Sequence, residues 1–251
     1  RSELVARAEL PAAVEDAMWS LFRRYYVDVS RTTFRRDLAQ KRHVILLLDT
    51  GDGSLRGFST IDVDERVIEG RRVVSLFSGD TIVDEAYWGQ KTLHRAFVRY
   101  LARLKLRHPR AAVYWFLISK GYKTYLLLTR NVPFAFPRHD RPTPPFEQAV
   151  LHHLAEARFG AAYDRSRGVL RFSRSQGRLR DGVAPVEARI AALPEVRFFV
   201  ERNPGHARGD ELCCLGRIDL GLFFTVARRV LLSPLVKRLR GAAAPAPASP
   251  S

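Results

Sequence analysis

The chain has 251 residues, of which 46% are hydrophobic and 10% aromatic, so its composition excludes a disordered protein and favours a large folded core. Its 42 Lys and Arg residues outnumber its 26 Asp and Glu residues, which leaves a formal net charge of +16. That charge attracts anionic partners such as nucleotide cofactors, acidic carrier proteins, nucleic acid or anionic lipid. A genome rich in G and C also produces Arg-rich chains without a functional cause, so the charge alone does not choose among these partners.

Cysteine content and hydropathy exclude two further classes, the disulfide-rich and the membrane-spanning proteins. Cys213 and Cys214 are adjacent, and neighbouring strand residues point to opposite faces, so we expect no disulfide between them. The sequence has no run of about 18 uncharged apolar residues. Two adjacent thiols and a distant histidine lack the spacing of a zinc site, so we expect no bound metal. These features predict a reduced, cytoplasmic protein.

The first predicted elements form an antiparallel meander. Strands are expected at His43–Asp49 and Leu55–Val63, and the Asp52-Gly53 pair between them is typical of a hairpin turn. Further strand segments are expected at Arg72–Phe77 and Thr81–Val83.

The next segment is predicted to be a turn that opens a helix. Apolar residues recur at helical spacing from Leu93 to Leu104, after the turn Tyr87–Lys91. Free backbone N–H groups in the first helical turn and the positive end of the helix dipole favour a phosphate over Gly89–Thr92. Gly89 permits close backbone approach, and Lys91 adds a positive charge. The alternative is an ordinary strand–turn–helix connection.

A buried strand at Ala111–Ser119 and a helix at Tyr122–Thr129 are expected next. The order of helix, antiparallel meander, anion-binding turn with helix, buried strand and helix resembles the GNAT superfamily of acyl-CoA N-acyltransferases over roughly residues 13–137. In that family the loop before the central helix holds the pyrophosphate of coenzyme A, usually with a Q/R-x-x-G-x-G/A pattern. Here the sequence AYWGQKTL has a single glycine, and Gln90 follows it.

The resemblance implies an α/β (α+β) fold with a mixed, largely antiparallel sheet flanked by helices and an elaborated C-terminal half. We expect a GNAT-like core at 1–137, a C-terminal extension or second GNAT-like half at 138–240, and a disordered Pro/Ala/Ser tail at 241–251.

The resemblance also implies roles for individual residues. Asp80 is the first candidate for the base that accepts a proton from the attacking amine, and Tyr125 is a candidate for the acid that protonates the thiolate. Backbone N–H groups near Ile82 and Val83 would polarise the thioester carbonyl. The donor, either a coenzyme A thioester or a phosphopantetheine-linked acyl group, would lie across Trp88, Gly89, Gln90, Lys91 and Thr92. The alternatives are that Asp80 caps the backbone and that the tyrosines of this helix only pack.

The second half is predicted to contain a helix at Phe146–Phe159 and a strand at Val169–Ser173. It is also predicted to contain a helix at Pro185–Leu193 and strands at Val196–Val200 and Glu211–Gly216. The loop between the last two strands, ERNPGHARGD, carries His206, which can exchange a proton near neutral pH beside a carboxylate. A purely structural turn is the alternative reading of this loop.

The C-terminal segment Leu220–Arg240 is predicted to be a basic amphipathic helix that docks on the core or lies on a membrane surface. Taken together, the sequence predicts an acyltransferase that acts on an amine of a small metabolite or peptide. Its donor would be acyl-CoA or an acidic acyl carrier protein. The alternatives are an aminoacyl-transferring or RNA-binding protein that uses Arg171, Arg174, Arg178 and Arg180, and a catalytically inactive GNAT-like binding module.

Overall fold

The computed structural model describes residues 1–172, 178–179, 188–219 and 221. Residues 1–218 form one compact unit. The predicted tail 241–251, the predicted helix Leu220–Arg240 apart from Gly221, and Arg174 and Arg180 lie outside the described residues. Within the described part of the chain, no helix combines the length and the apolar character needed to cross a membrane.

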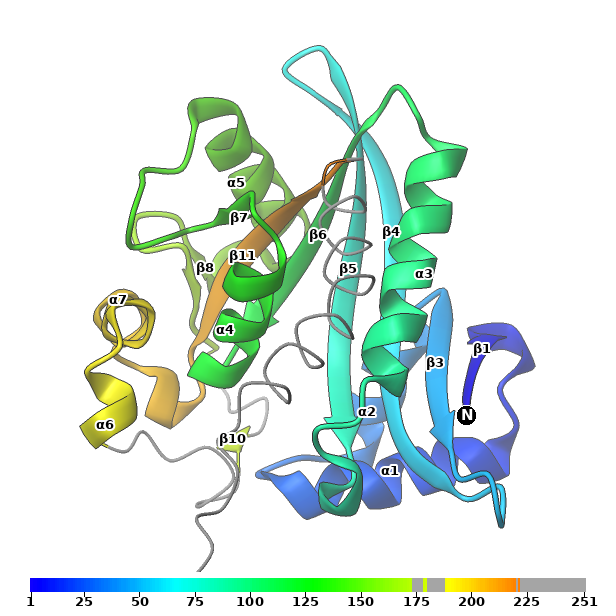
Figure 1. Cartoon of the computed structure of the whole chain (residues 1–251). Helices are drawn as coiled ribbons and strands as arrows, with labels where there is room; N and C mark the ends of the chain where they lie inside the picture. The colour runs from blue at the N-terminus through cyan, green and yellow to red at the C-terminus, as the bar shows by residue number, and fades with distance from the viewer. Residues whose placement is uncertain (173–177, 180–187, 220, 222–251) are drawn as a thin grey trace, which may run out of the picture. The chain divides into compact units, whose positions relative to one another are not determined.

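A nine-stranded sheet forms the centre of the unit (Figure 1). Its strands follow the order β1-β3-β4-β5-β6-β11-β9-β8, and β7 also pairs with β11. Every pairing in this sheet is antiparallel except the one between β5 and β6. The strands are β1 (Ser2–Ala6), β3 (His43–Leu48), β4 (Leu55–Ile68), β5 (Arg71–Val83), β6 (Ala112–Ser119), β7 (Ala135–Phe136), β8 (Tyr163–Asp164), β9 (Val169–Leu170) and β11 (Glu211–Ile218). Two short strands, β2 (Tyr26–Val27) and β10 (Arg178–Leu179), pair separately.

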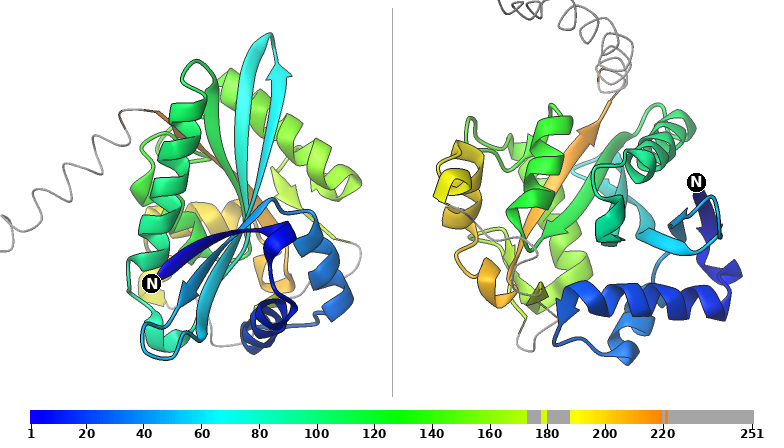
Figure 2. Two further views of the ribbon diagram at one scale, coloured as in Figure 1. Left: turned by 90° about the vertical axis from the view of Figure 1, so that its right-hand side faces the viewer. Right: turned by 60° about the horizontal axis from the view of Figure 1, so that its bottom comes forward.

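Helices cover both faces of the sheet. Helices α3 and α4 lie on one face, and α1, α2 and α5 lie on the other (Figures 1 and 2). The helices are α1 (Ala12–Tyr25), α2 (Arg31–Ala39), α3 (Thr92–Arg107), α4 (Tyr122–Asn131), α5 (Pro145–Phe159), α6 (Ala188–Ala191) and α7 (Pro194–Arg202), with short 3-10 turns η1 (Arg7–Glu9), η2 (Glu85–Tyr87), η3 (Gly160–Ala162) and η4 (His206–Arg208).

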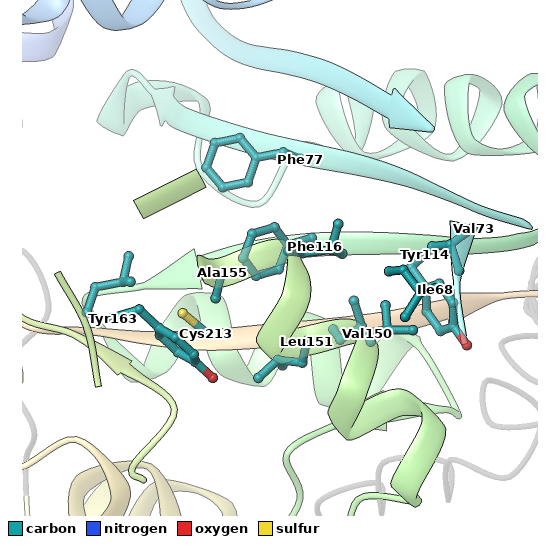
Figure 3. Packing of buried hydrophobic residues seen from close by; sticks show 13 residues of the cluster. Ile68, Val73, Phe77, Tyr114, Phe116, Val150, Leu151, Ala155, Tyr163 and Cys213 are labelled. Atoms are coloured by element: carbon teal, nitrogen blue, oxygen red, sulfur yellow. The ribbon is translucent and has the colours of Figure 1, made fainter. Parts of the chain in front are cut away.

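Two apolar clusters hold the helices to the sheet. In the first, Phe22 of α1 and Phe34 of α2 pack on Phe58 of β4 and Ile82 of β5. In the second, α5 packs its buried side chains on β6 and β11 (Figure 3). Strand β6 reads as a continuous apolar run because it is central and buried on both faces.

The predicted fold class is confirmed: the sheet is mixed, largely antiparallel and flanked by helices. The predicted hairpin, the central helix, the buried strand and the helix after it are present in the expected order. The helix at Phe146–Phe159 and the strand at Glu211–Gly216 are also confirmed. Among the described residues of the predicted strand Val169–Ser173, Val169–Leu170 form β9, and the described part of the predicted helix Pro185–Leu193 contains α6.

Two predicted segments need correction. Val196–Val200 was expected to be a strand and is part of helix α7. Pro194 occupies its first turn, and the buried Val196 and Phe199 are spaced three residues apart, so this short apolar run follows the helical period. The segments Arg72–Phe77 and Thr81–Val83 are one strand, β5, with an irregularity in its pairing between them.

The C-terminal half contributes β11 to the central sheet. Leu212 to Ile218 of β11 pair with Ser119 to Val113 of β6, so a strand from residue 211 onward lies directly beside the middle of the sheet. Cys213 and Cys214 on this strand are both buried and free. The boundary expected at residue 137 stays a prediction.

Candidate functional site

Strands β5 and β6 separate near the middle of the sheet. They pair in parallel from Val73 and Ala112 as far as Ser78 and Leu117. Beyond that step β5 continues alongside β4, while β6 continues alongside β11, and the two strands diverge (Figure 1). A diagonal hydrogen bond of 2.8 Å from Trp115 Nε1, opposite Leu76, to Ser78 Oγ also joins the two strands here. The sheet therefore opens immediately after Ser78.

The opening begins at a β-bulge in β5. Ile61 of β4 pairs with Ser78 and Ser59 pairs with Thr81, so β5 carries one residue more than β4 across this step. A Cβ atom at Gly79 would lie 2.5 Å from Thr60 Oγ1 and 2.9 Å from Lys41 Cε, so glycine is required there. Asp80 follows this bulge and lines a cavity together with Asp37 of α2.

The free edge of β5 presents backbone donors to the opening. The N–H of Asp84 donates to the carbonyl of Arg56 on β4 at 2.7 Å. Successive N–H groups of a strand alternate between its two edges, so those of Val83 and Thr81 point away from β4, toward the opening. The N–H of Ile82 faces β4, and its side chain is buried in the core. Of the two positions expected to polarise a carbonyl, only Val83 has a suitable direction.

The loop between β5 and α3 lies at the rim of the opening. Gly89 has a positive φ of 83°, and a Cβ there would enter open space. Helix α3 begins at Thr92, and its N-cap residue, Lys91, makes no side-chain hydrogen bond to the helix. Gln90 is exposed, and its N–H donates to the carbonyl of Tyr87 at 3.3 Å. The uncapped N–H groups of α3 and the open approach over Gly89 fit an anionic group such as a pyrophosphate.

Asp80 is the titratable group at the start of the opening, and it is partly buried. Burial raises the pKa of Asp80, and the positive charges of Lys41 and Lys120 oppose this rise. A carboxylate with a raised pKa is a stronger base than an exposed aspartate, so Asp80 is suited to accept a proton near neutral pH.

Charged and phenolic groups surround Asp80. Lys41 follows α2, and burial lowers its pKa, as does the charge of Arg158. Burial together with the charges of Asp80 and Glu211 raises the pKa of Tyr26 on β2.

Lys120, just after β6, lies with its Nζ 3.6 Å from Glu211 Oε1. No short sequence motif distinguishes these four residues around Asp80, and the sequence indicates Glu211 only as the first residue of a strand.

A cavity of about 240 Å³ ends at Asp80. It lies between β5 and the segment that joins α1 to α2, and its lining combines two aromatic rings with three carboxylates. The lining residues are Phe22, Asp28, Val29, Ser30, Thr33, Phe34, Asp37 and Asp80. In a chain of net charge +16 this cavity is locally acidic, which favours a cationic or amine-bearing occupant.

Tyr125 and His206 contact the same ring, Phe199 of α7. Tyr125 lies with its ring centroid 5.7 Å from that of Phe199, and its hydroxyl donates to the carbonyl of Pro137 at 3.0 Å. Burial raises the pKa of Tyr125. The ring of His206 lies 5.6 Å from Phe199, and its Nδ1 lies 2.9 Å from the carbonyl of Asn203. Both side chains therefore have structural partners in the α4–α7 packing.

The carboxylates near His206 have other partners. Asp210 Oδ2 lies 3.7 Å from Arg171 Nε, and Glu211 pairs with Lys120. Among the described residues, no group of three or more His, Cys, Asp or Glu side chains is arranged to hold a metal ion.

Comparison of the sequence with protein-family models gives no match. Comparison with curated proteins gives no match either.

Solved structures with a similar arrangement are N-acyltransferases of the GNAT family or proteins described as such. A probable N-acyltransferase from Enterococcus faecalis V583 aligns with a TM-score of 0.38 and 15% identity, over 51% of this chain and 32% of that chain. A GNAT family N-acetyltransferase (YhbS) from Escherichia coli in complex with CoA aligns with a TM-score of 0.37 and 19% identity, over 59% and 78%. A GNAT family acetyltransferase from Staphylococcus aureus Mu50 aligns with a TM-score of 0.38 and 11% identity, over 57% and 89%. The chain thus spans about a third of the Enterococcus protein.

Proposed function

We propose that the protein is an N-acyltransferase that moves an acyl group from a thioester to the amine of a small molecule. The observation that carries this proposal is the opening of the sheet after Ser78, with the Asp80 carboxylate at its start and the uncapped N-terminus of α3 at its rim. An acyl transferase needs these three parts together: an anion site for the donor, a channel for its thioester arm, and a base for the acceptor.

The donor is proposed to place its phosphates at Gly89–Thr92. Among the described residues other than its chain neighbours, no heavy atom lies within 4 Å of where a Cβ of Gly89 would be, so this side of the loop is open, and the N–H groups at the start of α3 carry the positive end of the helix dipole. The pantetheine arm would run along the free edge of β5, where the N–H groups of Thr81 and Val83 can donate to it. One of these donors would meet the thioester carbonyl and stabilise the negative charge that develops on its oxygen.

The acceptor is proposed to enter through the cavity of about 240 Å³ that ends at Asp80. A volume of this size suits a small amine or one arm of a larger molecule. Asp28 and Asp37 line the same cavity, and their negative charges would attract the ammonium form of the acceptor.

The reaction would proceed by direct attack. Asp80 accepts a proton from the bound ammonium group, and the nitrogen lone pair of the resulting neutral amine forms a bond to the thioester carbonyl carbon. The C–S bond then breaks and its electron pair leaves with sulfur. The thiolate takes up the second proton that the nitrogen loses, which gives the free thiol, and Asp80 returns its own proton to solvent. An amide and a thiol result, so no oxidant or reductant is needed.

Calorimetry with coenzyme A tests the donor site. Coenzyme A is expected to bind the wild-type chain and to raise its melting temperature, because it binds the folded state selectively. Gly89→Val should weaken this binding at least about tenfold, since a β-branched side chain both strains the positive φ and covers the phosphate approach. Gly70→Val is the matched control, because Gly70 has a φ of 73° and equally open surroundings but lies in the hairpin between β4 and β5.

The outcomes separate the possible donors. Binding of acyl-CoA supports a free coenzyme A donor, whereas binding of an acylated carrier protein without affinity for coenzyme A assigns the carrier as the donor. If neither binds at millimolar concentration, the proposed function is wrong. Binding without transfer to any of a panel of amines would favour the inactive binding module instead.

A further inference from the structure

Lys120 and Glu211 form an ion pair that is largely shielded from solvent. Glu211 is the first residue of β11, and the β6–β11 register places Leu212 opposite Ser119. Glu211 is therefore directly opposite Lys120. The Nζ and Oε1 atoms are 3.6 Å apart, and the side chains are only 15% and 7% exposed. Because this ion pair is shielded from water, its two side chains are held in place more firmly than those of an ion pair on the surface.

The pair lies on the same side of the sheet as Asp80. Phe116 and Ile118 of β6 pack in the α5 cluster, so Lys120, two residues further, points to that face as well. Asp80 lines a cavity on this face beside α1 and α2. Because β5 and β6 part after Ser78 and Leu117, Asp80 and Lys120 stand two and three residues beyond the last paired step, on opposite sides of one opening.

Two stacked aromatic rings lie between Lys120 and the cavity that Asp80 lines. The Nζ of Lys120 lies 5.3 Å from the ring centroid of Tyr26, and this ring stacks on Phe22 with centroids 4.7 Å apart. Phe22 lines the cavity of Asp80. The ammonium group is thus confined between Glu211 and the wall of the acceptor cavity, where its charge acts through a medium with little water.

We propose that Lys120, oriented by Glu211, is a positioning residue that keeps Asp80 ionised between turnovers. This inference rests on the proposed function, in which Asp80 is the base. An isolated carboxylate in this place would tend to remain protonated and would be unable to accept a proton from the amine. The ammonium group of Lys120 stabilises the ionised form of Asp80. The negative charge of Glu211 partly offsets this effect, so the Asp80 carboxylate stays basic enough to accept a proton from the amine.

The other charged groups that face Asp80 come from the N-terminal elements. Asp37 of α2 and Asp28 before α2 line its cavity, Lys41 follows α2, and Tyr26 belongs to β2. Lys41 also stabilises the ionised form of Asp80, whereas Asp37 opposes it. These groups are unchanged in the variants below, so they contribute equally to every comparison.

Two variants should shift the pH dependence of kcat/KM in opposite directions. Lys120→Met removes the positive charge and should make Asp80 harder to ionise, which lowers kcat/KM on the acid limb about tenfold. Glu211→Gln leaves the ammonium uncompensated and should ease ionisation of Asp80, which raises kcat/KM on that limb. Lys120→Arg keeps the charge and should stay close to wild type.

A direct titration separates this inference from the proposed function. In the full-length protein labelled with ¹³C-aspartate, the carboxyl signal of Asp80 is identified by its absence in Asp80→Asn, and its titration needs no turnover. Opposite displacements of its midpoint in Lys120→Met and Glu211→Gln support the inference even if no acyl transfer is found.

Unchanged midpoints, or displacements in the same direction, overturn the inference. Thermal unfolding confirms that each variant is folded, because removing one partner of a buried pair can destabilise the protein. If Lys120→Met does not fold, Glu211→Gln retains the ammonium and decides the question by its predicted direction.

Discussion

The indole Nε1 of Trp88 donates a hydrogen bond of 2.9 Å to the carbonyl oxygen of Val83. This contact folds the loop after β5 back on the end of the strand and satisfies a carbonyl that β6 does not reach. The Trp88 ring is half exposed and lies 5.6 Å from Nζ of Lys123 on α4. Trp88 therefore connects the free edge of β5 with the loop that leads to Gly89.

Replacing Trp88 tests whether this contact shapes the donor site. Trp88→Phe keeps an aromatic ring but loses the hydrogen bond to Val83, so the loop should be held less firmly and the KM for the thioester donor should rise several-fold. The value of kcat should change little, because the indole does not touch the acceptor cavity. Steady-state kinetics with varied donor concentration measure both values. A fall in kcat at unchanged KM would contradict this role.

Replacing Asp80 tests the base. Asp80→Asn should lower kcat by about 10²–10⁴-fold, the usual range for loss of general-base catalysis, while coenzyme A binding persists. Asp64→Asn is the matched control, since Asp64 is an exposed carboxylate of β4 paired with Arg66. A pH–rate profile that keeps its acid limb in Asp80→Asn would show that Asp80 is structural.

The same substitution should stabilise the fold at neutral pH. Burial raises the pKa of Asp80, so the folded state binds this proton more tightly than the unfolded state does. The ionised carboxylate therefore costs stability, and this cost appears as the pH rises above the unfolded value of about 4 and is complete above the folded pKa. Melting temperatures of Asp80→Asn should exceed those of wild type at pH 7 and converge with them near pH 3. A lower melting temperature at pH 7 would mean that the positive charges of Lys41 and Lys120 stabilise the Asp80 carboxylate by more than its burial costs.

Replacing Gly79 with a larger residue should destabilise the protein. Gly79→Ala places a methyl group against Thr60 Oγ1, and the branched side chain of Thr60 has little freedom to move away. We expect a loss of about 1–3 kcal/mol in the free energy of unfolding, together with lower activity because the bulge directs Asp80. Gly51→Ala serves as control, since its nearest neighbour is 3.4 Å away in the β3–β4 turn. Denaturant unfolding of both variants provides the comparison, and equal losses would argue against a tight bulge.

Tyr125 should behave as a structural residue. Tyr125→Phe removes the hydrogen bond to the Pro137 carbonyl and is expected to cost about 0.5–1.5 kcal/mol of stability, with kcat unchanged. Chemical denaturation and steady-state kinetics measure the two effects. A large fall in kcat without loss of stability would restore Tyr125 as the acid that protonates the thiolate.

The elements of this fold that could be predicted from the sequence are those with short-range signals. The Asp52-Gly53 turn, the helical spacing after Thr92 and the apolar run of β6 each depend on neighbouring residues in the chain. Their order predicted the sheet and the close approach over Gly89, whereas Asp80 lies inside β5, which continues to Val83. Val196–Val200 was expected to be a strand because its four apolar residues, interrupted by Arg197, fit a strand and a buried helical turn equally well.

The pairing across long stretches of sequence was decided only by the tertiary structure. Glu211 reaches Lys120 because β11 enters the sheet beside β6, and no local pattern encodes the partner or the register of a strand that lies about 90 residues away along the chain. The direction of the Val83 N–H and the bulge at Gly79 likewise follow from how β4 pairs with β5. Local physics determined the elements and the turn proposed to bind an anion, whereas strand register, which depends on packing of the whole sheet, assembled the charges around Asp80.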